Sequence, residues 1–381
     1  MYFYLIFIAV NLFIGLCLGF NAWAAFGQII HNRIIFWLIV LVFTQSYWII
    51  RFAAHTYNLE IPGTLYFIVT SLFALCIVAL LTVICADIVL LLTWLIKPLK
   101  PFYLFIKTHS VHAGVAVTAS VLLYCAAGFF IANSVRETHY KISVNKPLSV
   151  ESIKIVMVSD LHITTFTRTG AVKNLIEIIN RMNADLVLFA GDIVDMKLDS
   201  YTEKGLSGYF SQIRSGHGVY MIMGNHEYYG GHAEDIVKEF TSAGIRILRD
   251  EIVFLEPLGI TLIGRDDLAV ANFKSGPRAA LKDIMNHVDI SKPVVVLDHQ
   301  PQNRVIKETA ANGVDLQLSG HTHNGQFFPF NLIVKKIYIN AWKLWTDGAY
   351  HLIVSCGFGT WGPPIRTASY SEIVVVELTG K

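Results

Sequence analysis

The sequence has little charge in its first third and almost no cysteine in the remainder. Residues 1–135 contain five Lys or Arg and two Asp or Glu, whereas residues 136–381 contain 25 and 26. The balanced second part lacks the basic excess that is typical of nucleic-acid-binding proteins, so we predict no nucleic-acid partner. A single cleaved leader is too short to account for so long an apolar region. The chain therefore divides into an apolar part and a soluble part.

Cysteine usage excludes a disulfide framework in the soluble part. Of the five cysteines, only Cys356 lies there, and no two cysteines have the Cys-x-x-Cys spacing. The soluble part cannot form an internal disulfide, and the sequence disfavours a structural zinc knuckle.

Four apolar stretches in the first third are long enough to span a bilayer, for which about 20 residues suffice. They are Tyr2–Phe26, Ile34–Ile50, Leu65–Ile96 and Val111–Ala132. As one helix the third would be about 48 Å long, well beyond the ~30 Å hydrocarbon core, so it must tilt, kink or end near Asp87. An acid inside a membrane is costly and suggests function. For Asp87 we favour the alternative, a helix end or a pairing within the bundle.

Four spans predict an integral, multi-pass protein of the plasma or inner membrane. The N-terminus and the soluble domain then lie on the same side. The short loop between the third and fourth spans contains Lys97, Lys100 and Lys107. Positive charge in short loops marks the cytoplasmic side, which favours an extracytoplasmic soluble domain.

The pattern divides the chain into a transmembrane region of about four helices (1–133), a polar linker (134–149) and an α/β domain (150–381). We expect strands near 152–159, 185–190, 218–223, 260–264, 293–298, 314–319, 348–355 and 371–378, and helices near 171–182, 233–242 and 277–287. Alternating strands and helices are typical of a layered α/β fold.

Five apolar runs of the soluble part each end in side chains that bind metal ions. These side chains are Asp160 and His162, Asp192, Asn225, His299, and His321 with His323. Ligand sites form beyond the carboxyl ends of buried parallel strands, so we expect these groups to converge. The donors are all oxygen or nitrogen, which suits Mn²⁺, Fe or Zn²⁺ better than a soft metal. A lone histidine at such a place is more often a core residue, but so many together predict a metal centre.

The ordered motifs resemble those of the calcineurin-like metallophosphoesterase superfamily, and the apolar N-terminal part resembles its membrane-tethered branch. The motifs are Asp160-Leu-His162, Gly191-Asp192-Ile-Val-Asp195, Gly224-Asn225-His226-Glu227, His299 and Gly320-His321-Thr-His323. The resemblance implies a four-layer α/β/β/α sandwich that follows the transmembrane helices. It also implies a site for two divalent ions, for which the donor set leads us to expect Mn²⁺ first, with Fe or Zn²⁺ as alternatives.

The resemblance further implies a role for each motif residue. Asp160, His162 and His323 would bind the first metal. Asn225, His299 and His321 would bind the second, and Asp192 would bridge the two ions. His226 would be the general acid, oriented by Asp195.

We therefore predict a membrane-anchored phosphohydrolase that cleaves a phosphoester or pyrophosphate bond by metal-activated hydroxide. The expected partners are membrane lipids and a phosphorylated small molecule or lipid-linked substrate, such as an envelope precursor. One alternative is a non-catalytic, metal-dependent binding or scaffold protein of the membrane. Another is a transporter with a regulatory esterase domain, which a single intramembrane acid supports poorly.

Two segments beyond the motifs suggest contacts with substrate or membrane. Arg366 ends the loop GFGTWGPPIR, and we predict that it binds substrate phosphate through a bidentate fork, with a structural arginine as the alternative. The insert Phe327–Trp345 interleaves aromatic residues with lysines. It is either a segment that lies on the bilayer or an inner strand pair of the domain.

Overall fold

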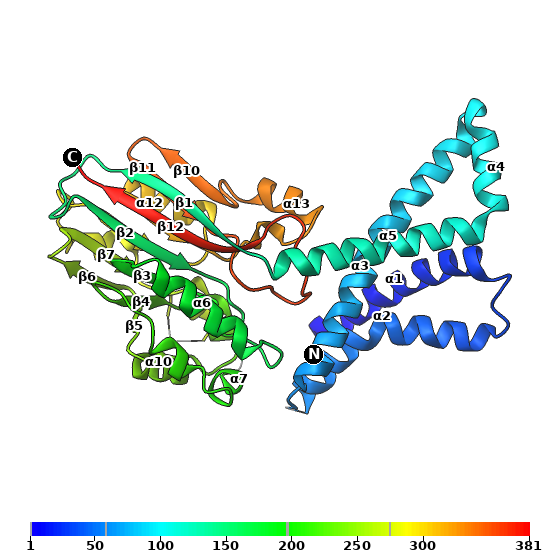
Figure 1. Cartoon of the computed structure of the whole chain (residues 1–381), viewed down its shortest axis with the longest axis horizontal. Coiled ribbons are helices and arrows are strands. Elements are labelled where there is room, and N and C mark those ends of the chain that lie inside the picture. The colour runs from blue at the N-terminus through cyan, green and yellow to red at the C-terminus, as the bar shows by residue number, and fades with distance from the viewer. Residues whose placement is uncertain (1, 58, 196–197, 274–275) are drawn as a thin grey trace. The chain divides into compact units, whose positions relative to one another are not determined.

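The computed structural model describes residues 2–57, 59–195, 198–273 and 276–381 (Figure 1). The chain forms two compact units. One comprises Met1–Phe130 with Gly362–Ile365, and the other comprises Ile131–Trp361 with Arg366–Lys381.

The first unit contains four helices that are long and apolar enough to cross a membrane, in agreement with the sequence prediction. These are α1 (Tyr2–Phe26), α2 (Arg33–Thr56), α3 (Gly63–Leu95) and α5 (Ser110–Ala132). A short 3₁₀ turn, η1 (Lys97–Leu99), and α4 (Lys100–Thr108) join α3 to α5. Large apolar side chains such as Phe13, Ile39 and Leu123 are exposed on these helices. Surfaces of this kind suit a lipid environment.

Helix α3 is continuous past Asp87. Its 33 residues make it about 50 Å long, so the helix does not end at the acid. The Asp87 carboxylate accepts a hydrogen bond from Asn21 Nδ2 of α1 at 3.3 Å. Asp87 is therefore paired within the helical unit, which is the alternative that we favoured from the sequence.

The second unit contains two six-stranded sheets. The first sheet has the order β1 (Val135–Ser143), β12 (Ser371–Thr379), β2 (Ser152–Val158), β3 (Leu186–Ala190), β4 (Val219–Ile222), β5 (Arg246–Leu248). Strands β2 to β5 run parallel, β12 is antiparallel to β2, and β1 is parallel to β12.

The second sheet has a parallel centre and two antiparallel edges. Its order is β10 (Lys343–Asp347), β11 (Tyr350–Val354), β9 (Leu316–Ser319), β8 (Val294–Leu297), β7 (Ile260–Gly264), β6 (Glu251–Leu255). Strands β7, β8, β9 and β11 run parallel, so their carboxyl ends share one edge of the sheet.

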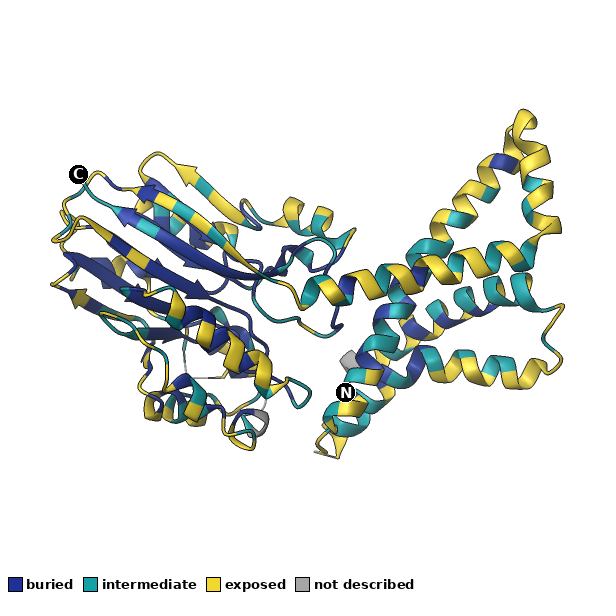
Figure 2. Ribbon diagram, in the orientation of Figure 1, coloured by how far each residue is buried: buried dark blue, intermediate teal, exposed yellow. Residues whose placement is uncertain are grey.

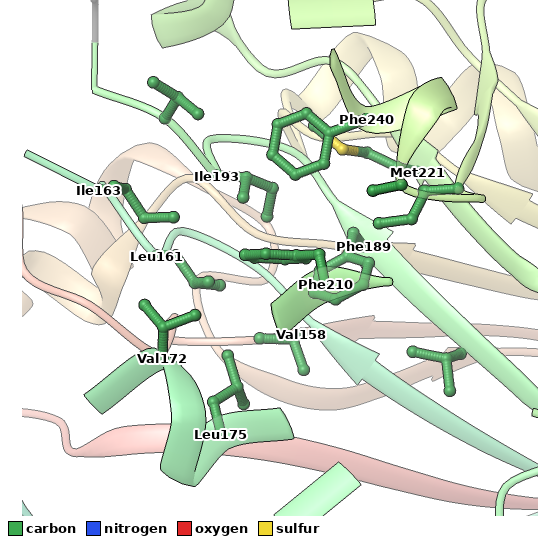
Figure 3. Close-up of a cluster of buried hydrophobic side chains, with 14 of the residues drawn as sticks. Val158, Leu161, Ile163, Val172, Leu175, Phe189, Ile193, Phe210, Met221 and Phe240 are labelled. Atoms are coloured by element: carbon green, nitrogen blue, oxygen red, sulfur yellow. The ribbon is translucent and has the colours of Figure 1, made fainter. Parts of the chain in front are cut away.

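Strand side chains alternate between two hydrophobic layers, as the twofold period of a strand requires. On β2, Ile153, Ile155 and Met157 pack against residues of the second sheet, whereas Val156 and Val158 pack against helices (Figure 3). The central strands of both sheets are buried over most of their length, as the dark blue arrows of Figure 2 show. Such strands read as apolar runs in the sequence.

Helices cover the outer face of each sheet. Those on the first sheet are α6 (Thr169–Arg181), α8 (Ser207–Phe210) and α10 (Ala233–Ser242), and those on the second are α11 (Leu281–Met285) and α12 (Asn303–Ala311). Shorter helical segments are α7 (Asp199–Thr202), α9 (Asn225–Tyr229), η2 (Leu268–Asn272), η3 (His323–Gly325) and α13 (Phe330–Ile337). The predicted four-layer α/β/β/α architecture is confirmed.

The predicted linker is wrong, because most of it is strand β1. This edge strand has the sequence VRETHYKIS and is largely solvated, so it carries no apolar run. Nine residues pair in parallel with β12, and this long-range pairing orders the segment. The short strands β5 and β6, strand β10 and helix α12 were also not predicted.

Candidate metal centre

The structure brings the predicted ligands to the carboxyl ends of strands from both sheets. Asp160 and His162 follow β2, Asp192 follows β3, Asn225 begins α9 after β4, His299 follows β8, and His321 and His323 follow β9. All of these strands are parallel within their sheets, so their ends meet at one edge. This is the convergence expected from the sequence.

One trio consists of Asp160, His162 and His323, whose donor atoms all lie within 4.8 Å of one another. The Nε2 atoms of the two histidines are 3.0 Å apart. His323 Nε2 is 3.5 Å from an Asp160 carboxylate oxygen. All three residues are buried.

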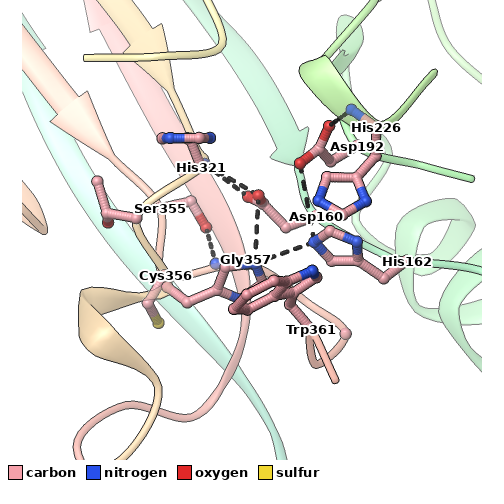
Figure 4. A network of polar contacts seen from close by, with 12 residues as sticks. Asp160, His162, Asp192, His226, His321, Ser355, Cys356, Gly357 and Trp361 are labelled. Atoms are coloured by element: carbon pink, nitrogen blue, oxygen red, sulfur yellow. Dashed lines mark hydrogen bonds and ion pairs between the residues drawn. The ribbon is translucent and has the colours of Figure 1, made fainter. Parts of the chain in front are cut away.

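A second trio consists of Asp192, His299 and His321, whose donor atoms also lie within 4.8 Å of one another. Asp192 Oδ2 is 3.1 Å from His299 Nε2 and 3.8 Å from His162 Nε2, so this carboxylate reaches both trios (Figure 4). His299 Nδ1 donates to the Ala190 carbonyl at 2.7 Å, which directs Nε2 into the site.

The residues present fit a pair of divalent cations. Asn225 Oδ1 is buried and has no hydrogen-bond partner among the described residues. Leaving a buried acceptor unpaired costs about 1–3 kcal/mol, which a cation would recover. The donors are imidazole nitrogens and carboxylate or amide oxygens, and ligands of this kind suit Mn²⁺, Fe or Zn²⁺.

Burial keeps three of the histidines in the neutral form that binds metal. It lowers the pKa of His162 to about 4 and that of His321 to about 3. Burial also lowers the pKa of His323 well below its ordinary value. At neutral pH these imidazoles carry a free lone pair, so a cation need not displace a proton from them.

The two carboxylates differ in their proton affinity. Burial raises the pKa of Asp160 to about 6, and the nearby Asp192 adds to this effect. Burial would also raise the pKa of Asp192, but His299 and His226 outweigh it and hold that pKa well below its usual range. Asp192 is therefore charged at neutral pH, as a bridging ligand must be.

His226 lies beside the two trios. Its Nδ1–H donates to Asp195 Oδ1 at 2.7 Å, and its backbone N–H donates to Asp192 Oδ1 at 2.9 Å. Burial alone would lower the pKa of His226, but the carboxylates of Asp192 and Asp195 raise it to about 9. The ring is therefore a charged proton donor at neutral pH.

Comparison with known proteins assigns the site to a family. A family model described as calcineurin-like phosphoesterase matches residues 153–325, which include every predicted ligand. An uncharacterized metallophosphoesterase of Aquifex aeolicus is 31% identical over 255 residues, covering 65% of this chain and 92% of that protein. The chain belongs to the calcineurin-like metallophosphoesterase family.

Relatives of this metallophosphoesterase include membrane proteins. An uncharacterized metallophosphoesterase of Helicobacter pylori is 35% identical over 233 residues, which make up 61% of this chain and 61% of that protein. The chain thus matches about three fifths of that relative's length. The Danio rerio protein named transmembrane protein with metallophosphoesterase domain is 28% identical over 246 residues, covering 62% of this chain and 56% of that one. The resemblance to the membrane-tethered branch is confirmed.

Most of the predicted ligands of this metallophosphoesterase have a strained backbone conformation. Positive φ angles occur at Asp160, His162, Asp192, His321 and His323. A residue other than glycine pays about 1–2 kcal/mol for this conformation. Such strain is typical of functional sites, where the surrounding fold holds side chains in one place. The preceding Gly191 has φ +89°, and a Cβ there would collide with His299 Nδ1 and the backbone of Gly224.

Glu227 is a site residue that the sequence analysis missed. It is fully buried, and its carboxylate accepts hydrogen bonds from the backbone N–H groups of Asp192, Ile193, Val194 and Gly224. The side chain therefore positions the turn that presents Asp192. A glutamate three residues after the helix-capping Gly224 is a capping-box signal that could have revealed it.

Arg366 lies differently from the prediction. The side chain is fully buried, and its NH groups donate to the backbone carbonyls of Cys356, Gly357 and Gly359 and to Ser369 Oγ. One guanidinium nitrogen also lies 3.2 Å from His323 Nδ1. The guanidinium group thus forms its hydrogen bonds within its own loop. This geometry supports the alternative that Arg366 is a structural arginine. Its effect on the site is to orient His323.

Exposed aromatic rings surround His226 at the surface. The Tyr229 ring lies 5.7 Å and the Trp361 ring 6.3 Å from the His226 ring, measured between centroids. Both side chains are about half exposed. The predicted general acid therefore lies beside two half-exposed aromatic rings.

The insert does not form the inner strand pair that we considered. It contains α13, which has no buried residue, and β10, an edge strand whose residues are mostly exposed. The other alternative, a segment that lies on the bilayer, is consistent with this exposure.

Proposed function

We propose that this protein is a membrane-anchored hydrolase that cleaves a phosphoester or pyrophosphate bond at a two-metal site. One observation carries the proposal: the Asp192 carboxylate of one ligand trio also lies 3.8 Å from His162 of the other, with the His226–Asp195 pair beside it. Membership of the metallophosphoesterase family supports the same chemistry.

Each ligand has a place in this proposal. Asp160, His162 and His323 would bind one cation, and Asn225, His299 and His321 the other, with Asp192 shared. When bound, two such cations supply hydroxide at neutral pH and offset negative charge on the phosphoryl group. We propose Mn²⁺ for the site, with Fe or Zn²⁺ as alternatives.

His226 would protonate the oxygen of the leaving group. The hydrogen bond from Nδ1 to Asp195 fixes the ring, so Nε2 carries the proton that is transferred. The raised pKa keeps that proton available at neutral pH. Asp195 acts on the reaction through His226 and is a positioning residue.

The proposed substrate is a phosphate ester carried by a lipid. The chain has four helices suited to a membrane, and two residues separate the last of them from the first strand of the soluble domain. A catalytic domain held so near a bilayer meets lipid-linked phosphates at high local concentration. The positive loop between α3 and α5 favours an extracytoplasmic position for the domain.

The test is hydrolysis of aryl phosphate mono- and diesters by the full chain in detergent with Mn²⁺. We expect turnover that chelation abolishes and added Mn²⁺ restores. Asp192→Asn should abolish turnover, while His232→Ala, at an exposed histidine outside the site, serves as the control and should retain it.

The same experiment distinguishes the proposal from a non-catalytic scaffold. A protein that binds Mn²⁺ tightly but turns over neither ester class, nor a pyrophosphate diester, would be a metal-dependent binding protein. That outcome would overturn the proposed hydrolysis.

A further inference from the structure

The metal site and the membrane attachment lie at the same edge of the first sheet. Val135, the first residue of β1, pairs with Ser371, the first residue of β12. Strand β12 runs antiparallel to β2 with Val374 opposite Met157, so the start of β12 lies beside the carboxyl end of β2. That end is followed by the ligand Asp160. The start of β1 is therefore two strand spacings, about 10 Å, from the strand that presents the first ligands.

The polypeptide allows little distance between this edge and the bilayer. Helix α5 ends at Ala132 and β1 begins at Val135. Three residue steps span at most about 11 Å. The start of β1, at the edge that carries the metal site, is thus connected to the end of α5 by two residues.

Helix α13 exposes an apolar face that the domain leaves uncovered. Leu332, Ile333 and Ile337 are 50%, 54% and 57% exposed, and Figure 2 shows most of the helix in yellow. At 3.6 residues per turn, these side chains and Lys336 fall within about 140° of the helix circumference. A surface helix in a soluble domain normally turns such a face toward the core. We refer to Leu332, Ile333, Lys335, Lys336 and Ile337 as the α13 surface.

The start of α13 packs against the segment that carries His323. Gly325, at the end of η3, packs so closely that a Cβ there would collide with the backbone of Phe330 and Asn331. The same short segment η3 begins with the ligand His323. On the other side of the insert, Thr322 Oγ1 donates to the Ala341 carbonyl at 2.5 Å. Both ends of the insert are thus fastened to the segment that presents His321 and His323.

Lysine side chains lie beside the apolar face of α13. Lys335 and Lys343 line a cleft of about 260 Å³ together with Trp342, and Lys343 Nζ lies 4.6 Å from the centroid of the Trp342 ring. Lysines next to aromatic and aliphatic side chains are typical of membrane-interface segments, where they attract anionic head groups.

We propose that the α13 surface lies on the bilayer and presents the phosphate head group of a membrane lipid to the metal site. The proposal rests on the proposed hydrolytic function and names its substrate class, a phosphate ester on an acyl-chain lipid. The apolar side chains enter the boundary between head groups and acyl chains, and Lys335, Lys336 and Lys343 face the anionic head groups.

The activity test compares two matched double variants of the full chain in nanodiscs. Ile333→Glu with Ile337→Glu changes the α13 surface. Phe254→Glu with Ile290→Glu is the control, since both side chains are 57% exposed and outside the insert. Substrates are long-chain phosphatidic acid in the same nanodisc and a soluble aryl phosphate.

We expect the α13 variant to lose about tenfold in kcat/KM on the lipid substrate, corresponding to about 1.4 kcal/mol. It should keep its rate on the aryl phosphate, and the control should keep both rates. An equal loss on both substrates, or no loss on the lipid, would overturn the proposed surface. If the unchanged protein hydrolyses neither substrate with Mn²⁺, the proposed function fails instead.

A second measurement tests bilayer contact without relying on turnover. Ile333→Cys and Ile290→Cys variants are labelled with a fluorophore, and quenching by lipids with a spin label near the head group is recorded, with the signal of the unsubstituted chain subtracted. We expect quenching at Ile333→Cys that exceeds quenching at Ile290→Cys several-fold. Equal quenching at the two positions would contradict the proposed contact.

Discussion

At the scale of single residues, the site depends on charge that is held away from water. Asp192 remains ionised because His299 and His226 lie beside it, while burial keeps His162, His321 and His323 neutral. The carboxylates of Asp192 and Asp195 raise the pKa of His226, and Asp192 also raises the pKa of His299. What distinguishes His226 is its hydrogen bond from Nδ1 to Asp195, which makes it the candidate proton donor.

Asp195→Asn should weaken catalysis most at high pH. A general acid must be protonated, so activity falls as pH rises through the pKa of His226, which is about 9 in this structure. Removing the Asp195 charge should move the alkaline limb of the pH–rate profile to lower pH by about one unit or more. The measurement is kcat/KM against pH for an alkyl phosphate, with an aryl phosphate, a good leaving group, as the comparison. An unchanged alkaline limb would argue against the pairing.

Glu227→Gln should destabilise the turn that presents Asp192. The glutamate accepts four backbone hydrogen bonds, whereas glutamine offers one acceptor oxygen and turns its amide hydrogens toward N–H groups. Each buried N–H group left without an acceptor costs about 1–3 kcal/mol. We expect a lower Tm of the soluble domain and weaker Mn²⁺ binding, measured by thermal unfolding with and without Mn²⁺. The exposed Glu256→Gln is the control and should leave both unchanged.

At the scale of elements, the parallel strands end at a common edge, and the turns that follow them set the direction of the predicted ligand side chains. The turns after β2, β3 and β9 leave their strands through positive φ angles, as Asp160 and Gly191 show. Helix α13 follows η3, the segment that carries His323. The absence of a side chain at Gly325 lets the start of the helix pack closely against this segment.

Two glycine substitutions separate backbone strain from packing of α13. Gly348 has φ +60° and open space around its Cβ position, so Gly348→Ala should cost only the backbone term of about 1 kcal/mol. Gly325 has φ +71° and backbone atoms in the way, so Gly325→Ala should cost at least about 1 kcal/mol more. Thermal unfolding of both variants gives the comparison. Equal losses would show that α13 does not pack tightly on η3.

At the scale of the whole molecule, we expect metal binding to be linked to folding of the domain. The predicted ligands come from the ends of β2, β3, β4, β8 and β9, so a bound cation would join both sheets. A ligand that binds only the folded state stabilises it by about 2.7 kcal/mol at a hundredfold excess over Kd.

Chelation should therefore lower the Tm of the soluble domain, and Mn²⁺ should restore it. Asp192→Asn should abolish most of this Mn²⁺-dependent shift, because the shared ligand loses its charge. Differential scanning fluorimetry of the full chain in detergent gives the readout, with His232→Ala as the control. A Tm that is insensitive to Mn²⁺ in the unchanged protein would contradict the two-metal site.

The short connection between α5 and β1 should matter for lipid substrates alone. Inserting 20 Gly and Ser residues between Asn133 and Ser134 allows a separation of about 25 Å and frees the domain from the bilayer. We expect a lower rate on phosphatidic acid in nanodiscs and an unchanged rate on aryl phosphate. Retention of the lipid rate would show that close tethering is not required.

Much of the fold could be predicted from the sequence because its central strands are buried on both faces. Runs such as Leu186–Ala190 are therefore continuously apolar, and the metal-type side chains that follow them are visible as motifs. The four membrane helices are visible for a similar reason, since lipid demands apolar residues all around a helix. These signals are local, so each can be recognised in the sequence without knowledge of the segment that packs against it.

Only the tertiary structure decided the features that depend on contact between distant segments. Strand β1 is polar, and only its pairing with β12 makes it a strand. The Arg366 guanidinium group donates hydrogen bonds to carbonyls of its own loop, and the Glu227 carboxylate accepts hydrogen bonds from backbone N–H groups of the turn that contains Asp192. The sequence by itself determined which groups could bind metal and that four helices suit a membrane. The packing of the two sheets determined which ligands share a site, because distances across a core follow from long-range pairing rather than from neighbours in the chain.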